Sequence, residues 1–167
     1  QETGLLVTKT DLKGQITYIN REFLEISGFS EAELIGASHN IVRHPDMPVE
    51  AFADLWTTLK EQRPWVGLVK NRCKNGDFYW VLANVTPIWE SGSVTGYMSV
   101  RRRPDREQVA ATDKAYRLFR ENKAGGLRIQ DGRIVSGRDK VLGLFHNMSL
   151  FTQLAWAFGV VIALGTL

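Results

Sequence analysis

The amino-acid sequence predicts an α+β domain in which one five-stranded antiparallel sheet carries short helices on one face. Apolar and polar residues alternate near the start of the chain and again after Pro64, whereas the apolar residues between follow helical spacing. Turn-forming pairs such as Asn75-Gly76 separate the later alternating stretches, and short turns join antiparallel strands. Strands that frame a run of helices in this order form a single sheet with the helices gathered on one side.

Five segments have the composition and spacing of strands. Residues 11–14 supply turn-forming side chains between the first two. Among the later three, Asn75-Gly76 tolerates the positive φ angles of a two-residue type I′ turn, and Ser91-Gly92 makes the next connection. The predicted strands are residues 5–8, 16–20, 65–73, 78–89 and 94–102.

Helix signals lie between the second and third strands. Gly28 is placed to end a first short helix as its C-cap. Ser30 and Glu33 have the spacing of a capping box, which predicts a second short helix running to Gly36. A third helix presents an apolar stripe at positions i, i+3, i+4 and i+7, formed by Phe52, Leu55, Trp56 and Leu59.

Charge divides the chain into three zones. Residues 1–100 hold 9 basic and 12 acidic side chains, residues 101–140 hold 12 basic and 6 acidic ones, and residues 141–167 hold none of either kind. We therefore predict three parts, which are a folded domain, a basic linker with a helix and a small hairpin, and an apolar segment. Their predicted bounds are 1–103, 104–147 and 148–167.

The apolar segment has the length of a membrane span. Twenty uncharged residues, 148–167, match the roughly 30 Å hydrocarbon layer of a bilayer, so we expect them to begin a transmembrane helix. A buried or oligomer-forming helix is the alternative. Basic residues before a span favour the cytoplasmic side, which explains the basic linker better than a nucleic-acid partner does. The single cysteine, Cys73, forms no internal disulfide and fits a reducing compartment.

Three motifs carry a resemblance to a known family. The run Arg43-His44-Pro45-Asp46-Met47-Pro48 lies within the first, and the motifs as a whole are residues 39–48, 64–72 and 74–81. Together they resemble the flavin-binding PAS domains of bacterial aerotaxis receptors, over roughly residues 5–103. The resemblance implies non-covalent FAD and a homodimeric receptor in the inner membrane, with this domain on the cytoplasmic side. It also implies that flavin redox state is reported to a chemotaxis signalling module, and that the chain is no enzyme.

The same resemblance gives candidate ligands for FAD. Arg43 suits phosphate oxygens, and His44 is placed to hydrogen-bond or stack. Asp46 is expected to accept from a ribose hydroxyl or to orient its two neighbours, with helix capping before Pro48 as the alternative. His39 is a further candidate, for which a purely structural role is equally open.

Aromatic and amide side chains complete the predicted site. Trp56 and Trp65 are expected to wall the isoalloxazine ring, although Trp56 also fits a core position on its helix stripe. Asn20 and Asn71 are expected to hydrogen-bond the flavin edge, because an amide donates and accepts without carrying charge. A helix N-cap is the alternative for Asn20, and an ordinary strand contact for Asn71.

Other functions leave different signals. A haem sensor would use His39 or His44 as the iron ligand and a distal donor on the last strand, where we expect no inward Trp or Arg in residues 94–100. Photosensing PAS domains keep a reactive cysteine in an Asn-Cys-Arg run of the helical region, where this chain reads Asn40-Ile41-Val42-Arg43, so Cys73 is expected to be a bystander. A cofactor-free interaction module remains a further alternative. No glycine-rich dinucleotide motif favours an oxidoreductase.

Overall fold

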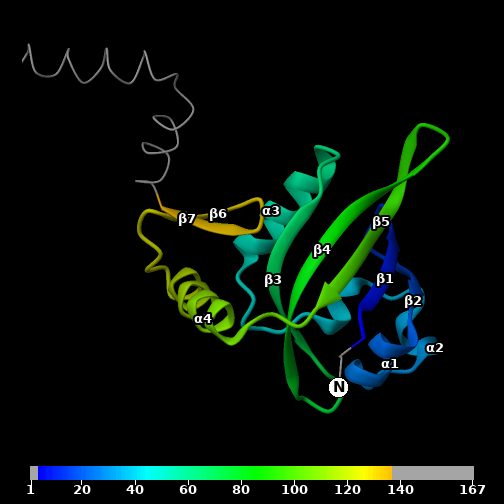
Figure 1. The fold of residues 1–167 in the computed structure, drawn as a ribbon, viewed down its shortest axis with the longest axis horizontal. Coiled ribbons are helices and arrows are strands. Elements are labelled where there is room, and N and C mark those ends of the chain that lie inside the picture. The colour runs from blue at the N-terminus through cyan, green and yellow to red at the C-terminus, as the bar shows by residue number, and fades with distance from the viewer. Residues whose placement is uncertain (1–3, 137–167) are drawn as a thin grey trace, which may run out of the picture. The chain divides into compact units, whose positions relative to one another are not determined.

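The computed structural model describes residues 4–136, which contain a five-stranded antiparallel sheet in the order β2-β1-β5-β4-β3 (Figure 1). This confirms the predicted α+β class and the antiparallel sheet. The first and last strands pair in the middle of the sheet, so the beginning and the end of the domain meet there. The strands are β1 (Leu6–Asp11), β2 (Ile16–Ile19), β3 (Trp65–Arg72), β4 (Phe78–Glu90) and β5 (Ser93–Arg102).

The helices between β2 and β3 begin and end where local chemistry places them. Gly28 takes the left-handed conformation (φ 73°) that ends the first helix, and Ser30 and Glu33 form the predicted capping box on the second. Figure 1 shows these two helices beside β1 and β2, and the longest helix of this group beside β3. The four elements are α1 (Arg21–Ser27), α2 (Glu31–Leu34), the 3₁₀ helix η1 (His39–Val42) and α3 (Val49–Lys60).

The β3–β4 hairpin is present, but its turn is not the predicted type I′. β3 ends at Arg72 and β4 begins at Phe78, so five residues form the loop. Only Gly76 in this loop has a positive φ (95°), whereas a type I′ turn needs two such residues in succession. The Asn75 side chain instead accepts a hydrogen bond from the Asp77 backbone N–H, which stabilises the wider loop. Ser91 and Gly92 do form the two-residue turn, with φ values of 50° and 81°.

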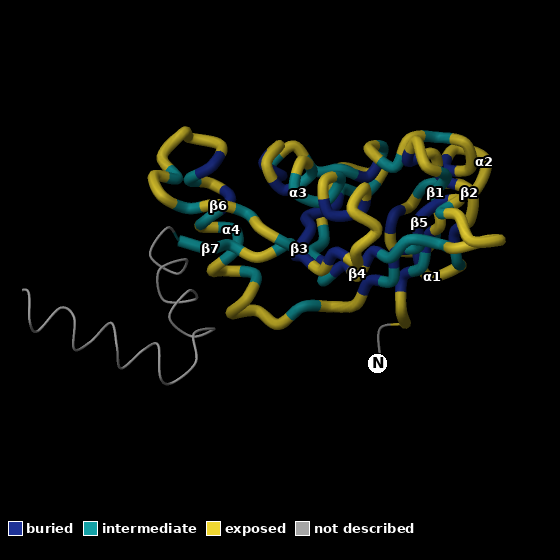
Figure 2. Tube along the Cα trace, turned by 90° about the horizontal axis from the view of Figure 1, so that it is seen from above, coloured by how far each residue is buried: buried dark blue, intermediate teal, exposed yellow. Residues whose placement is uncertain are grey.

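A fourth α-helix, α4 (Arg106–Arg120), packs on the sheet face opposite α3. The Tyr116 hydroxyl donates to the Leu68 carbonyl oxygen at 2.8 Å, and its ring stacks on Trp80 with centroids 6.2 Å apart. Leu68 and Trp80 point away from the side of β3 that carries Val69 and Asn71, because side chains alternate along a strand. The basic segment after β5 therefore docks on the sheet. Figure 2 shows the buried residues concentrated in the strands.

Beyond α4 the chain forms a small two-stranded sheet, β6 (Leu127–Gln130) and β7 (Arg133–Ser136), as the sequence predicts. Its tip, residues 129–134, belongs to the same compact unit as the preceding domain and α4. The predicted membrane segment, residues 148–167, lies outside the described residues. Among the helices of residues 4–136, none has both the length and the apolar character required to cross a bilayer.

Candidate functional site

A cavity lies between α3 and the inner face of the sheet. The side of α3 that faces it is the apolar stripe predicted from the sequence, Phe52, Leu55, Trp56 and Leu59. Small and aliphatic side chains of β3 and β4 form the opposite wall, and Tyr97 of β5 meets Trp56 edge to face at 5.8 Å. The cavity is thus a largely apolar slot with aromatic surfaces, and its polar groups are confined to a few positions.

One end of the cavity contains a buried cation. Arg101 of β5 is 4% exposed, and its guanidinium donates to Thr8 Oγ1 at 3.0 Å and lies 2.7 Å from His39 Nε2. No carboxylate among the described residues pairs with it. Burial lowers the pKa of Arg101 to about 10, which still leaves the side chain charged at neutral pH. The cavity therefore has a positive end.

His39 completes this end as a neutral ring. Burial, followed by the charge of Arg101, lowers the pKa of His39 to about 3. A neutral ring that accepts from Arg101 at Nε2 carries its proton on Nδ1. His39 is therefore engaged with the protein, and its Nε2 is not free to ligate a haem iron.

Several buried polar atoms at the cavity have no hydrogen-bond partner among residues 4–136. Four such side-chain atoms occur among the described residues, and three belong to residues that line the cavity, namely Arg43 Nε, Asn71 Nδ2 and Ser99 Oγ. The fourth is the Tyr79 hydroxyl, which lies near the Asn71 side chain without meeting hydrogen-bond geometry. Leaving a buried donor unpaired costs about 1–3 kcal/mol. Three of them around one cavity indicate a site that is completed by a ligand with hydrogen-bond acceptors.

Four of the eight sequence-predicted residues meet at this cavity: His39, Arg43, Trp56 and Asn71. The backbones of Arg43 and Asn71 form an isolated antiparallel bridge, which joins the segment after η1 to β3. The Arg43 guanidinium lies 3.5 Å from the centre of the Phe52 ring, and burial lowers its pKa. A cation–π contact of this kind fixes the guanidinium at the edge of the slot.

His44 and Asp46 lie outside the cavity lining. The His44 ring accepts from the Asp46 backbone N–H at 3.0 Å and meets Phe78 edge to face. The Asp46 carboxylate accepts from Lys70 Nζ at 2.5 Å, and the pKa of Asp46 is lowered chiefly by that bond. α3 begins after Pro48 without a side-chain cap, so Asp46 is not the helix cap. Contact of this pair with the phosphate or ribose part of a cofactor stays a prediction.

Asn20 and Trp65 also lie outside the cavity lining. The Asn20 side chain caps α1, accepting from the N–H groups of Val7 and Phe23 and donating to the Leu5 carbonyl. Trp65 is 1% exposed, and its indole N–H donates to Asp54 at 2.7 Å. Both polar groups are satisfied by the protein itself. Direct contact of either residue with a cofactor remains an untested prediction.

Three further residues of the cavity lining, Arg101, Ser99 and Tyr97 on β5, were not predicted from the sequence. Their spacing of two places them on one face of the strand, which is a visible signal. The expectation that the last strand offers no inward Trp or Arg is wrong, because Arg101 of β5 lines the cavity. Which face of β5 lies toward the cavity depends on how β5 pairs with its two neighbours in the sheet, β1 and β4.

A family model described as the PAS fold matches residues 16–101. The chain belongs to the PAS family. The aerotaxis receptor of Escherichia coli (strain K12) is 48% identical over 130 residues, which cover 78% of this chain and 26% of that receptor. The nitrogen fixation regulatory protein of Klebsiella pneumoniae is 27% identical over 103 residues, covering 61% of this chain and 21% of that protein. This PAS chain thus spans about a quarter or less of the length of these relatives.

Solved structures share the PAS fold. A PAS domain from Colwellia psychrerythraea aligns with a TM-score of 0.55 and 23% identity, over 60% of this chain and 86% of that one. A light-oxygen-voltage domain studied with a flavin analogue aligns with a TM-score of 0.58 and 19% identity, over 71% and 87% of the two chains. At these identities the likeness concerns the fold alone.

Proposed function

We propose that this PAS domain binds FAD non-covalently in the cavity between α3 and the sheet, and that it acts as a redox sensor for energy taxis. The observation that carries the proposal is the set of three unpaired polar atoms around an apolar, aromatic slot. An isoalloxazine ring is flat and apolar over its faces and has hydrogen-bond acceptors at its edges. The 48% identity to an aerotaxis receptor supports the choice of a flavin.

The residues present fit a flavin. Trp56, Tyr97 and the aliphatic wall suit its ring faces, while Arg43 and Asn71 offer donors to its edge. FAD, when bound, supplies reversible electron transfer at this site. Arg101 holds a positive charge at the cavity and favours ring states with added electron density. His39 keeps that guanidinium in place while remaining neutral.

The proposed output follows from the relatives. We propose that the full protein is a homodimeric receptor in the cytoplasmic membrane, with this domain on the cytoplasmic side. In this proposal the flavin redox state passes through α4 and the β6–β7 hairpin to a downstream chemotaxis signalling module. The roles of His44, Asp46, Asn20 and Trp65 toward FAD remain part of this proposal.

Purification of the chain tests the cofactor. We expect a flavin absorption spectrum, and mass analysis of the molecule released on denaturation should identify FAD. A haem Soret band, FMN alone or a colourless protein would each contradict the proposal.

Removing the unpaired donors should empty the site. We expect Asn71→Ala and Arg43→Ala each to weaken flavin affinity by about 5- to 150-fold and so to lower flavin occupancy, because each deletes a buried hydrogen bond worth about 1–3 kcal/mol. Occupancy is measured as the ratio of flavin to protein absorbance. Asn84→Ala is the matched control, since Asn84 is an exposed residue on the neighbouring strand β4. Equal flavin occupancy in all three variants would show that Arg43 and Asn71 do not bind the flavin.

Light should not form a cysteinyl adduct on this flavin. Cys73 is absent from the cavity lining, its thiol contacts the Ile26 carbonyl, and burial raises the thiol pKa. We therefore expect blue light to cause no thermally reversible loss of the visible flavin band, and Cys73→Ala to behave as the parent does. An adduct spectrum that disappears in Cys73→Ala would show that the thiol reaches the ring.

A further inference from the structure

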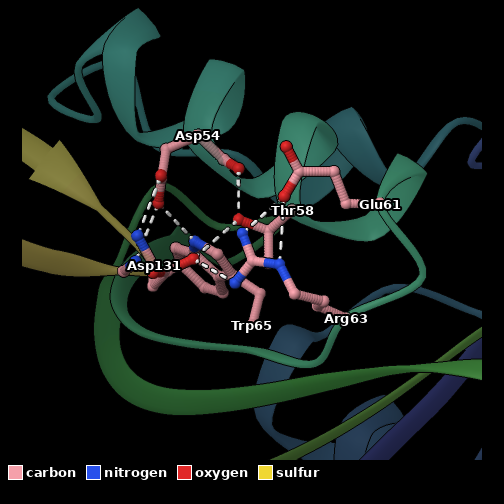
Figure 3. Close-up of polar contacts among 7 residues, drawn as sticks. Asp54, Thr58, Glu61, Arg63, Trp65 and Asp131 are labelled. Carbon is pink, nitrogen blue, oxygen red and sulfur yellow. Dashed lines mark hydrogen bonds and ion pairs between the residues drawn. The ribbon is translucent and has the colours of Figure 1, made fainter.

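The helix that lines the cavity also holds the tip of the β6–β7 hairpin. Leu55 and Trp56 of α3 face the cavity, and the residue before them, Asp54, is directed to the hairpin (Figure 3). The Asp54 carboxylate accepts three N–H groups and pairs with no cation among the described residues. The cavity wall and the hairpin contact are thus adjacent positions of one rigid element.

The two oxygens of the Asp54 carboxylate accept hydrogen bonds from different donors. Oδ1 accepts from the Asp131 backbone N–H at 2.9 Å, and Oδ2 accepts from the Gly132 N–H and from the Trp65 indole, both at 2.7 Å. The carboxylate therefore binds a turn and the first residue of β3 at once. A rotation or translation of α3 relative to β3 and the hairpin tip would break or lengthen some of these bonds, because their donors belong to elements other than α3.

The turn is shaped to reach this carboxylate. Asp131 and Gly132 have φ values of 49° and 77°, which is a type I′ turn and directs successive N–H groups to one side. A side chain on Gly132 would collide with the Val66 carbonyl, so the turn lies close against β3. The Asp131 carboxylate is held in turn by Arg63 Nη1 at 2.7 Å. This cluster fastens the tip to α3 and β3 together (Figure 3).

We propose that Asp54 is a latch that transmits the state of the cavity to the β6–β7 hairpin. This inference rests on the proposed flavin function. A change in the redox state of the flavin ring displaces the α3 side chains packed on it. Because Asp54 belongs to the same helix, its hydrogen bonds to the Asp131 and Gly132 N–H groups then break or form. In the sequence, residues 137–167 follow directly after the hairpin.

Hydrogen exchange at single amides, measured on the whole chain in the oxidised and the dithionite-reduced state, tests the latch. In the parent we expect exchange at Asp131 and Gly132 to differ at least tenfold between the two states. Asp54→Asn keeps one acceptor oxygen and places an amide N–H₂ against the donor at the other position, so at least one of the two tip amides should exchange fast in either state. Glu50→Gln, an exposed carboxylate one turn earlier on α3, is the matched control and should behave as the parent.

The flavin spectrum separates the two possible failures. The latch is overturned if the parent shows redox-linked exchange along α3 but none at the tip. It is also overturned if Asp54→Asn keeps the redox difference in exchange at both Asp131 and Gly132. If Asp54→Asn does not fold, Gly132→Ala breaks the same contact from the hairpin side and must give the same loss. If the purified chain shows no flavin absorption bands, the proposed function is wrong. The proposed transmission from the cavity to the hairpin is then wrong as well.

Discussion

Replacing Arg101 by Met is expected to lower the midpoint potential of the bound flavin by about 30–60 mV. The Arg101 guanidinium is buried at the cavity with no carboxylate partner among the described residues, so its charge acts on whatever occupies the cavity. A hydrogen bond to a charged group contributes about 1.5–3 kcal/mol, and 1.4 kcal/mol corresponds to about 30 mV for a two-electron couple. Loss of a positive charge disfavours the electron-rich reduced ring, so the midpoint potential falls. Spectroelectrochemical titration measures the shift.

Two further variants make this test specific. Arg102→Met removes an exposed arginine from the next position of β5, where the side chain points to the other face, and should leave the potential unchanged. Arg101→Lys keeps the charge and should restore most of the parent potential. An unchanged potential in Arg101→Met, with flavin still bound, would show that the guanidinium does not act on the ring.

Trp65→Ala is expected to lower the free energy of unfolding by about 3–5 kcal/mol. The indole is 1% exposed, and removing a buried aromatic side chain of this size leaves a cavity with that cost. Urea unfolding monitored by circular dichroism measures the loss. Trp89→Ala is the control, because Trp89 is 52% exposed and should cost within about 0.5 kcal/mol.

Trp65→Phe distinguishes a structural role of this residue from contact with the flavin. Phe fills most of the volume but cannot donate to Asp54, so we expect a loss of about 1–3 kcal/mol in unfolding free energy and no change in flavin occupancy or spectrum. A shifted flavin spectrum with unchanged stability would instead place the indole against the ring, as the family resemblance implies.

Local features of the fold could be predicted because their causes lie within a few residues. The Ser30–Glu33 capping box, the Gly28 cap and the Ser91-Gly92 turn each depend on side chains and φ preferences at the site itself. The helical stripe of α3 predicted a buried face, and that face lines the cavity. The predicted type I′ turn at Asn75-Gly76 was wrong, because the length of this loop depends on where β3 and β4 stop pairing.

The cavity was only partly predictable. Arg43, Asn71 and His39 came from motif resemblance, and the structure gathers them at one cavity. Arg101 was missed because a charged residue near the end of a strand is normally solvent-exposed. Its burial depends on β1, 93 residues away in sequence at Thr8, and on His39, 62 residues away. Spacing within β5 could not reveal those partners.

The sequence by itself determined the order of strands and helices, the antiparallel meander and the apolar face of α3, because periodicity, capping and turn chemistry act locally. Only the tertiary structure decided which polar residues meet. In the folded protein, Asn20 caps a helix, Trp65 donates a hydrogen bond to Asp54, and Arg101 lines the cavity. The physical reason is that strand order and register set which side chains share a face, and these depend on contacts between distant parts of the chain.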